Sequence, residues 1–583
     1  MSLPTTARVD RKTVAQVLEQ VAAFMELKGE NTFRIRAFRT AARTIAALPV
    51  EVGAALDDGT LAATRGIGPA TLQIVAELVR TGRTTLLEEL REQVPPGLVE
   101  MLQISGLGVA KIRQIHESLG IDSLPELEAA AQDGRLARLP RFGQKTAENI
   151  LKGIAFLRQA GGFRLSHHAR EEASALADAL ARLPGVQQAL VAGEVRRRSE
   201  VVREIVLVLV ADAPPAELFA RLSQLPGVSE FAGQDERRVT LRFAGGTIAQ
   251  VVVTTPVNAG AVLVQATGAE GHLRELADHA RAMGCSLEGA ALWRAGSGFV
   301  PTPDEATLYG ALGLPVVPPE LREGRGEVAL ARDGRLPALL ERAQLRGFLH
   351  CHTNYSDGSN TVRQLAEACR DAGYEWLGIT DHSQAAAYAG GLTADDLQRQ
   401  CDEIEAVNAG LDGLRVLKGI EADILGDGAL DFAPEVLARL DFVIGSIHSR
   451  FNMSREEMTA RVLAAMDSPY LTILGHPTGR LLLSRDPYGL DMEQVIAKAA
   501  ATGVAIEINA DPHRLDLDWR VVPQARAAGV AISIGADAHN LAGLANVDYG
   551  VGVARKGGLG PDDVLNTRTA DGFLAFARAR SGR

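Results

Sequence analysis

Residues 347–358, GFLHCHTNYSDG, join an apolar run that ends in His350 and His352 to a loop that contains Asp357. Six further apolar runs of strand type follow along the rest of the chain: EWLGITDH, LRVLKGIEAD, DFVIGSIH, LTILGHP, VAIEINA and VAISIGADAH. Stretches with helical periodicity, such as TVRQLAEACRDAG and MEQVIAKAAATG, separate these runs. Alternation of strands and helices implies a parallel sheet, and seven repeats predict a seven-stranded α/β barrel over residues 346–583.

Histidines and carboxylates gather where these predicted strands end. Six of the seven histidines beyond residue 345 end a predicted strand, and only His513 does not. Because the carboxyl ends of parallel barrel strands meet at one rim, these side chains are expected to converge. Satisfied or exposed histidines, taken one at a time, do not account for the joint pattern. The rim is therefore predicted to supply ligands for two or three divalent ions.

The charge of the chain is unevenly distributed. The formal net charge is −11, yet residues 1–160 carry 20 Lys and Arg against 18 Asp and Glu, whereas residues 346–583 carry 22 against 32. An acidic region repels phosphate unless its carboxylates hold cations. The net charge therefore does not exclude a nucleic-acid partner. The excess of acidic residues in residues 346–583 makes this region the expected place for metal ions.

Several classes of protein are excluded by composition. The four cysteines form no CxxC pair, which excludes a disulfide scaffold and a zinc ribbon. The sequence contains no run of about 18 apolar residues, which argues against a membrane span, and its first residues lack the apolar segment of a secretory signal. The expectation is a cytoplasmic protein with no membrane partner.

Glycine hairpins interrupt the helical patterns of the first 160 residues. Gly66 and Gly68 form one GxG turn, Gly106 and Gly108 a second, and a third candidate around Gly143 carries Arg141 in place of its first glycine. Such a hairpin directs the backbone N–H groups of the following helix outward, where a phosphate can bind. Binding of DNA there would be independent of sequence and sensitive to salt. Plain turns of a helical bundle are the alternative.

The motifs of the last third resemble those of the polymerase-and-histidinol-phosphatase (PHP) metal-hydrolase domain: HCHTNYSDG, ITDHS, GIEADIL, SIHSRF, LGHPTGRLL and IGADAHN. The resemblance implies one metal held by His350, His352, Glu421 and Asp537. Glu421 would bridge to a second, held with His448 and His476, and Asp357, His382 and His539 would hold a third. It implies Mn²⁺, although histidine with carboxylate also suits Zn²⁺ and Fe²⁺.

Catalytic roles in the barrel are expected for three residues. Glu421 and Asp537 would hold the ions that act on a phosphoester. Arg480 lies four residues after His476 and is placed to bind a substrate phosphate.

With the hairpins and a strand-rich middle, the whole chain resembles bacterial family X DNA polymerases that carry a C-terminal PHP domain. PELREGRGE, TGAEGH and YGVGVARKG also contribute to this likeness. The resemblance implies an all-α helix-hairpin-helix N-terminal region, an α+β nucleotidyltransferase-like palm with a thumb, and the α/β barrel. The expected domains are an 8-kDa-like helical domain with the first hairpin, a fingers-like domain with the other two, the palm, the thumb, a linker and the PHP barrel, at residues 1–90, 91–160, 161–258, 259–325, 326–345 and 346–583.

The palm motifs of this family are altered. Gly-Ser-x-Arg-Arg reads Gly193-Glu194-Val195-Arg196-Arg197, the Asp-x-Asp positions read Glu204-Ile205-Val206, and the third Asp reads Gln250. Nucleotidyl transfer needs about two Mg²⁺ ions held by facing carboxylates, and only Glu204 can still provide one. Glu194 adds a like charge where the triphosphate would lie, so the palm is predicted to be an inactive scaffold that retains Gly193 and Arg197.

These features together predict a DNA-repair protein with a metal-dependent 3′–5′ exonuclease in the barrel, acting on gapped, nicked or 3′-ended DNA. A working template-directed, gap-filling polymerase is the first alternative. A non-catalytic DNA-binding scaffold and a small-molecule phosphatase are the others.

Overall fold

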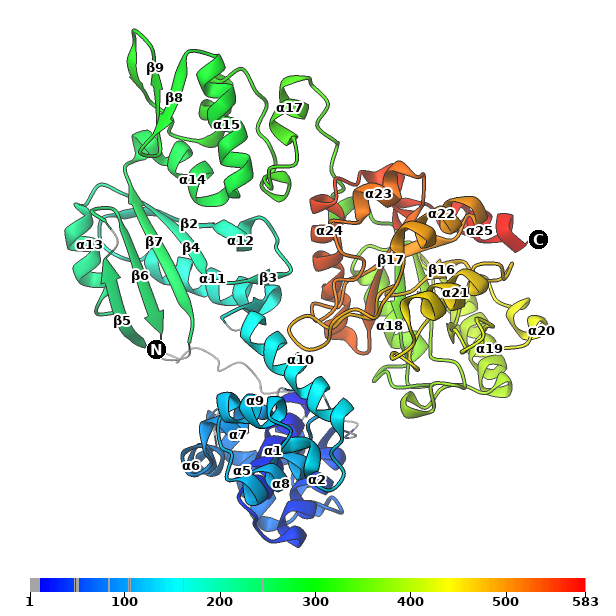
Figure 1. Ribbon diagram of the computed structural model, residues 1–583. Coiled ribbons are helices and arrows are strands. Elements are labelled where there is room, and N and C mark those ends of the chain that lie inside the picture. Colours follow the sequence, from blue (N-terminus) through cyan, green and yellow to red (C-terminus); the bar gives the residue numbers. More distant parts are fainter. Residues whose placement is uncertain are drawn as a thin grey trace. The chain divides into compact units, whose positions relative to one another are not determined.

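The computed structural model describes residues 11–46, 48, 52–81, 84–102, 104, 106–160, 162–233, 235–243 and 246–581. The chain divides into two compact units, residues 1–161 and 162–583 (Figure 1). In the part described, no helix combines the length and apolar character needed to cross a membrane.

The first unit consists of helices around one apolar core, which includes Leu18, Ile45, Met101 and Ile112. Its helices are α1 Arg11–Leu27, α2 Thr32–Ala46, α3 Val52–Asp57, α4 Thr60–Ala63, α5 Pro69–Thr81, α6 Thr85–Gln93, α7 Pro96–Met101, α8 Val109–Leu119, α9 Leu124–Gln132 and α10 Gln144–Ala160. Helices α5, α8 and α10 each begin directly after a glycine hairpin, which agrees with the helical expectation for this region.

The second unit begins with a five-stranded sheet in the order β2-β4-β7-β6-β5. The strands are β2 Val186–Ala192, β4 Ile205–Ala211, β5 Val228–Gly233, β6 Arg238–Phe243 and β7 Ile248–Thr254. The same region contains three helices, α11 Ser166–Leu180, α12 Gly193–Arg196 and α13 Pro215–Leu222, and α11 packs against β2 and β4. The short strand β1 Arg164–Leu165 pairs with β3 Val201–Val202. Strand β4 is buried on both faces, so its sequence IVLVLVA is apolar throughout.

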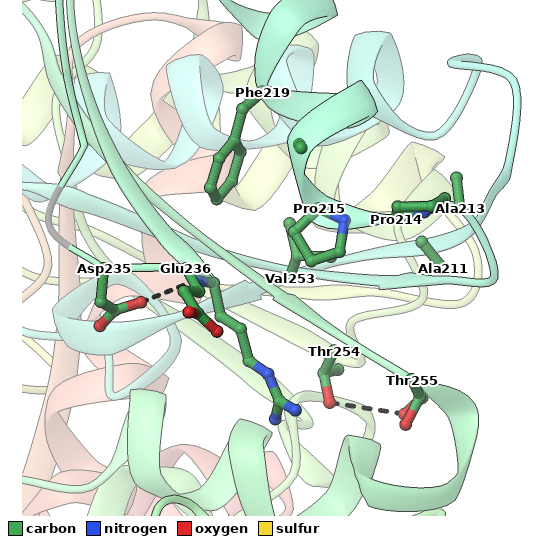
Figure 2. A pocket seen from close by; sticks show the side chains of 12 residues that line it. Ala211, Ala213, Pro214, Pro215, Phe219, Asp235, Glu236, Val253, Thr254 and Thr255 are labelled. Carbon is green, nitrogen blue, oxygen red and sulfur yellow. Dashed lines mark hydrogen bonds between the residues drawn. The ribbon is translucent and has the colours of Figure 1, made fainter.

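A cavity of about 520 Å³ opens beside α13, at the carboxyl ends of β4 and β7 (Figure 2). Phe219, Val253 and Thr254 are among its lining residues. It lies at the opposite end of these strands from Val206 and Gln250, which are paired near the strand starts. The cavity is therefore separate from the altered palm motifs.

A smaller region with its own core follows the sheet. It comprises α14 Ala259–Thr267, α15 Glu270–Ala282, the antiparallel strands β8 Cys285–Glu288, β9 Ala291–Arg294 and β10 Gly298–Val300, and helices α16 Glu305–Ala311 and α17 Glu327–Arg332. Leu276, Leu292 and Leu308 join in this core.

The last region is a barrel of eight parallel strands in the order β13-β12-β11-β18-β17-β16-β15-β14. The strands are β11 Gly347–Cys351, β12 Trp376–Ile379, β13 Arg415–Lys418, β14 Glu421–Asp423, β15 Ile444–Ser446, β16 Ile473–Leu474, β17 Ala505–Asn509 and β18 Ile532–Ala538. Its helices are α18 Val362–Asp371, α19 Ala394–Gly410, α20 Pro434–Leu437, α21 Arg455–Ala465, α22 Met492–Thr502, α23 Val522–Ala527, α24 Val547–Lys556 and α25 Ala570–Ser581.

The predicted α/β barrel is confirmed, but its count of seven strands is wrong. The run LRVLKGIEAD forms two strands that break at Gly419 and Ile420. A side chain at Gly419 would lie 2.5 Å from the Phe442 ring and 2.6 Å from the Ile379 carbonyl, so this crowded point leaves room for glycine only. Strand β13 pairs with β12, and β14 pairs with β15. A parallel bridge between His382, which follows β12, and Glu421 of β14 links the two ends of the strand order.

Candidate functional site

The nine predicted metal ligands gather at one rim of the barrel, and eight of them lie near or after the carboxyl end of a strand, whereas Glu421 was expected at a strand end and lies at a strand start. Glu421, the first residue of β14, lies at the centre and is fully buried. Its two carboxylate oxygens are 2.8–3.8 Å from ring nitrogens of His350, His352, His382, His448 and His476. Asp537 Oδ1 lies 3.3 Å from His352 Nε2 and 3.7 Å from His350 Nε2.

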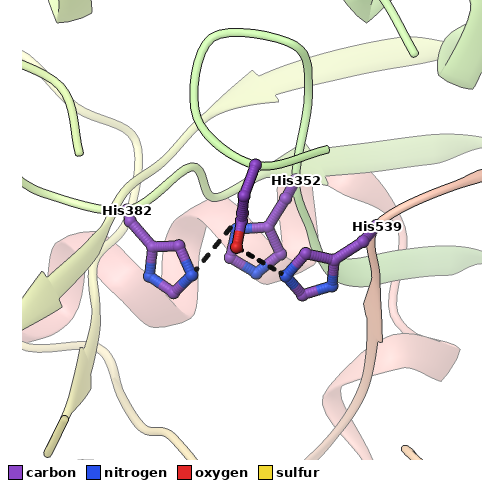
Figure 3. Close-up of side chains that lie close together, drawn as sticks. His352, His382 and His539 are labelled. Atoms are coloured by element: carbon purple, nitrogen blue, oxygen red, sulfur yellow. Dashed lines mark ion pairs between the residues drawn. The ribbon is translucent and has the colours of Figure 1, made fainter. Parts of the chain in front are cut away.

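Asp357 forms a second centre within this cluster, together with His352, His382 and His539, whose rings lie close together in Figure 3. Its oxygens lie 3.9 Å from His352 Nδ1, 3.7 Å from His382 Nε2 and 3.4 Å from His539 Nε2. These four residues can offer ligand atoms within 4.8 Å of one another, as can His350, His352 and Asp537, and also His382, Glu421 and His448. His352 and His382 are each shared between two groups.

The donor atoms of the cluster fit a divalent cation better than they fit one another. Buried His350 Nε2, both ring nitrogens of His352, His382 Nδ1 and Glu421 Oε2 make no hydrogen bond. His382 Nδ1 faces Glu421 Oε2 at 2.8 Å without forming one. Buried polar atoms without partners are costly, and a cation between them would remove that cost.

Three of the metal-ligand residues have a strained backbone conformation. His350, His476 and Asp537 have φ values of 59°, 23° and 51°, in the left-handed region that residues with a side chain rarely adopt. The pairing of β11 with β18 also shifts register between Leu349 and Cys351, around His350. Strain and strand irregularity of this kind persist where the position of a side chain matters.

The electrostatics of the cluster are dominated by its carboxylates. Burial would raise the pKa of Glu421, but His448, His350 and His382 together hold it well below its usual range. Burial would lower the pKa of His448, yet Glu421 and Asp423 raise it to about 10. The pKa of His352 falls to about 4 because of burial and the adjacent His539 and His382. Positive charge is thus strongly favoured beside Glu421.

Sequence reasoning missed Glu507, which supports the cluster from β17. Its Oε1 lies 2.5 Å from His350 Nδ1, and its Oε2 accepts a hydrogen bond of 2.7 Å from the His476 backbone N–H. A glutamate inside the apolar run VAIEINA was the available signal. Asp423 acts similarly, with its Oδ1 2.6 Å from His448 Nδ1. Partners of this kind fix the ring orientation of ligand histidines.

The structure distinguishes between two arginines near the rim. Arg480 donates hydrogen bonds to Asp518 and to the carbonyls of Arg514 and Leu515, so it holds the 514–518 segment in place. Its contact with a substrate phosphate stays a prediction. Arg514, which sequence reasoning did not single out, has its Nε 3.5 Å from Asp537 Oδ2.

Two of the positions predicted to have lost their carboxylates lie opposite each other on adjacent parallel strands, and the loss of a polymerase site stays a prediction. Val206 on β4 pairs directly with Gln250 on β7, and Val206 packs in an apolar cluster with Val262 of α14. A side chain at Gly193 would lie 2.8 Å from Val206, so this space is filled. Burial, and secondly the charge of Glu194, raise the pKa of Glu204.

The palm arginines are held by carboxylates of the following region. Arg196 makes two hydrogen bonds with Glu305, of 2.7 and 2.8 Å, and Arg322 contacts the same carboxylate. Arg197 donates to Glu323 at 2.9 Å. Both guanidinium groups are thus paired with acids.

The three hairpins of the first unit share one backbone geometry. Gly66, Gly106 and Arg141 have φ values of 98°, 79° and 68°, so Arg141 adopts the left-handed conformation of the glycine that it replaces. In each copy the backbone N–H of the following residue (Ile67, Leu107 or Phe142) donates a hydrogen bond to the carbonyl oxygen of the residue three positions earlier. A side chain at Gly68, Gly108 or Gly143 would meet nothing within 4 Å, so the backbone is open to a ligand there.

Four segments of the chain match known protein families. Residues 10–84 match the helix-hairpin-helix domain, 98–155 the SAM-like helix-hairpin-helix tandem, 262–323 the DNA polymerase beta thumb, and 349–511 the PHP domain. "DNA polymerase/3'-5' exonuclease PolX" of Bacillus subtilis is 35% identical over 97% of this chain and 99% of its own length. A "Probable phosphatase" of Acetivibrio thermocellus is 34% identical over 27% of this chain and 63% of its own length.

Proposed function

The chain belongs to the family X DNA polymerases that carry a C-terminal PHP domain. We propose that it acts as a metal-dependent 3′–5′ exonuclease in DNA repair. The hairpins bind the backbone of gapped, nicked or 3′-ended DNA, the barrel hydrolyses the phosphodiester, and the palm serves as a scaffold. One observation carries the proposal: ring nitrogens of five histidines lie 2.8–3.8 Å from the oxygens of buried Glu421, and several of the facing atoms, His350 Nε2, His382 Nδ1 and Glu421 Oε2 among them, make no hydrogen bond.

The centre would hold up to three divalent ions. His350, His352, Glu421 and Asp537 take the first, Glu421 with His448 and His476 the second, and Asp357, His382 and His539 the third. Mn²⁺ suits these mixed nitrogen and oxygen donors, and Zn²⁺ is the other candidate. The chemistry that such ions supply is activation of water at neutral pH and neutralisation of charge on the phosphate.

The protein's own residues position the reaction. Glu507 holds the His350 ring and the His476 backbone, and Asp423 holds the His448 ring. Arg514, beside Asp537, brings a positive charge to the rim, where it would bind a phosphate oxygen of the substrate. Arg480 keeps the segment that carries Arg514 in place.

Loss of polymerase activity is supported by the palm geometry. Two carboxylates must face each other to hold a pair of Mg²⁺ ions, and this register is occupied by Val206 and Gln250. Arg196 is engaged by Glu305, so it does not face an open triphosphate site. A template-directed polymerase is the second candidate, because the Bacillus subtilis relative that matches nearly the whole chain has polymerase in its name.

The proposal is tested by incubating a 5′-labelled primer on its template with Mn²⁺, Mg²⁺ or Zn²⁺, with and without dNTPs. A ladder of shortened primers is expected from the parent. The Glu421→Ala variant should lose it while keeping DNA affinity, because that change removes a ligand common to two ions. Glu375→Gln, which removes only a surface ion pair with Arg346, is the control.

Three results would contradict the proposal. Degradation by Glu421→Ala at the parental rate would place the nuclease outside the barrel. Primer extension with dNTPs would favour the polymerase. Release of phosphate from small monoesters, with DNA left intact, would favour the phosphatase.

A further inference from the structure

Tyr388 is an exposed aromatic residue at the edge of the metal-ligand cluster. Its side chain is 71% exposed, although its ring centroid lies only 6.1 Å from the ring of His382 and 6.3 Å from the ring of His448. A large apolar ring next to a buried polar centre contributes little to the core of the barrel. Its position therefore points to contact with whatever the centre binds.

The loop that carries Tyr388 is held in a defined conformation. It leaves the barrel at His382 and returns at Leu392, whose N–H donates a 2.8 Å hydrogen bond to the His382 carbonyl. Ala386 and Ala389, on either side of the tyrosine, are buried, and the Ala385 N–H donates to Asp431 at 2.7 Å. Tyr388 lies on the short 3₁₀ helix Ala387–Ala389 between these anchors. The ring is thus presented outward at a fixed distance from the ligands.

A flat exposed ring beside a phosphoester-binding centre suits a nucleobase. When the last phosphodiester of a strand lies at the centre, the nucleoside attached to it extends toward the rim. Stacking of a base on an aromatic ring does not depend on which base is present, because every base has a π face. It therefore agrees with an enzyme that removes any terminal nucleotide.

Resting on the exonuclease function proposed above, we propose that Tyr388 stacks on the 3′-terminal base of the bound strand and makes the centre prefer a nucleotide with a base over an abasic one. Tyr388 contributes only to binding of the terminal base, and the phosphodiester is hydrolysed at the cluster of metal ligands. The tyrosine hydroxyl is not needed for this role, so phenylalanine should replace it.

The test compares Tyr388→Ala and Tyr388→Phe on two oligonucleotides, one ending in a normal 3′ nucleotide and one ending in a tetrahydrofuran abasic residue. Gln384→Ala, an exposed truncation in the same loop, is the matched control. With Mn²⁺, Tyr388→Ala should raise KM about tenfold for the normal end, the size expected for loss of one stacked base, with kcat nearly unchanged. It should leave the abasic end unaffected, and Tyr388→Phe should match the parent on both.

Binding supplies a second readout. An oligonucleotide with 2-aminopurine at its 3′ end and a phosphorothioate linkage to slow cleavage should lose fluorescence on binding to the parent and to Tyr388→Phe, but not to Tyr388→Ala. Equal effects of Tyr388→Ala on both ends, or equal quenching by all variants, would overturn the stacking role alone. Absence of DNA degradation by the parent would overturn the exonuclease proposal and the stacking role with it.

Discussion

Replacement of Glu507 by glutamine should weaken metal binding without unfolding the barrel. Glu507 is fully buried, and its Oε1 lies 2.5 Å from His350 Nδ1. Gly535 leaves room for it, since a side chain there would lie 1.8 Å from Oε1. Glutamine keeps the size of the side chain but removes the charge that draws the proton to Nδ1 and leaves Nε2 free for a metal.

The size of the effect follows from the bond that changes. A hydrogen bond to a charged group contributes about 1.5–3 kcal/mol and a neutral one about 0.5–1.5 kcal/mol, and the middles of these ranges differ by about 1.3 kcal/mol. That is roughly tenfold in affinity, at the lower end of the 10- to 100-fold range typical for the outer partners of ligand histidines.

The assay is a Mn²⁺ titration of exonuclease activity, paired with direct measurement of Mn²⁺ binding by calorimetry. The concentration for half-maximal activity should rise about tenfold in Glu507→Gln, with most of kcat recovered at saturating Mn²⁺. Glu375→Gln should titrate like the parent, because its carboxylate pairs with Arg346 at the protein surface. A Mn²⁺ titration of Glu507→Gln identical to that of the parent would show that the Glu507 contact does not tune His350.

Three further outcomes are expected. Gly108→Leu should weaken DNA binding about tenfold at moderate salt with unchanged thermal stability, because its backbone is open and its φ of −74° suits any residue; unaltered affinity would reduce this hairpin to a turn. The double variant His350→Ala with Glu421→Ala, in which degradation cannot hide synthesis, should not extend a primer, and extension at ordinary polymerase rates would refute the inactive palm. Glu305→Gln should destabilise the second unit by about 3 kcal/mol at neutral pH. Burial alone would raise the pKa of the Glu305 carboxyl, but the pairing with Arg196 and Arg322 is the stronger effect and lowers that pKa from 4.5 to about 2. Since the folded pKa is the lower one, this stabilisation is complete above pH 4.5 and is lost as the pH falls toward 2, and urea unfolding of both proteins across that range should show the difference shrink; a difference independent of pH would refute the assignment.

Strand ends and turns were readable from the sequence because they depend on local pattern. The apolar runs that end in His350, His382, His448 and His476 predicted a parallel barrel, and parallel strands bring their carboxyl ends to one rim whatever the details of packing. The third hairpin was also recognisable, although only the structure shows that Arg141 takes the left-handed conformation of a glycine. The inactive palm, predicted from the absence of carboxylates at Val206 and Gln250, also rests on the sequence and stays a prediction.

Other features depend on contacts between residues far apart in the chain. At Gly419, where the strand is interrupted, a side chain would meet the Phe442 ring, and the support of His350 comes from Glu507, 157 residues away. The engagement of Arg480 by the 514–518 segment, and the nearness of Arg514 to Asp537, follow from loops that no periodicity describes. The sequence by itself determined which side chains reach the rim, because a repeating strand pattern places them there. Only the tertiary structure decided which of them touch, because a distance of 3 Å between two side chains depends on the packing of every strand between them.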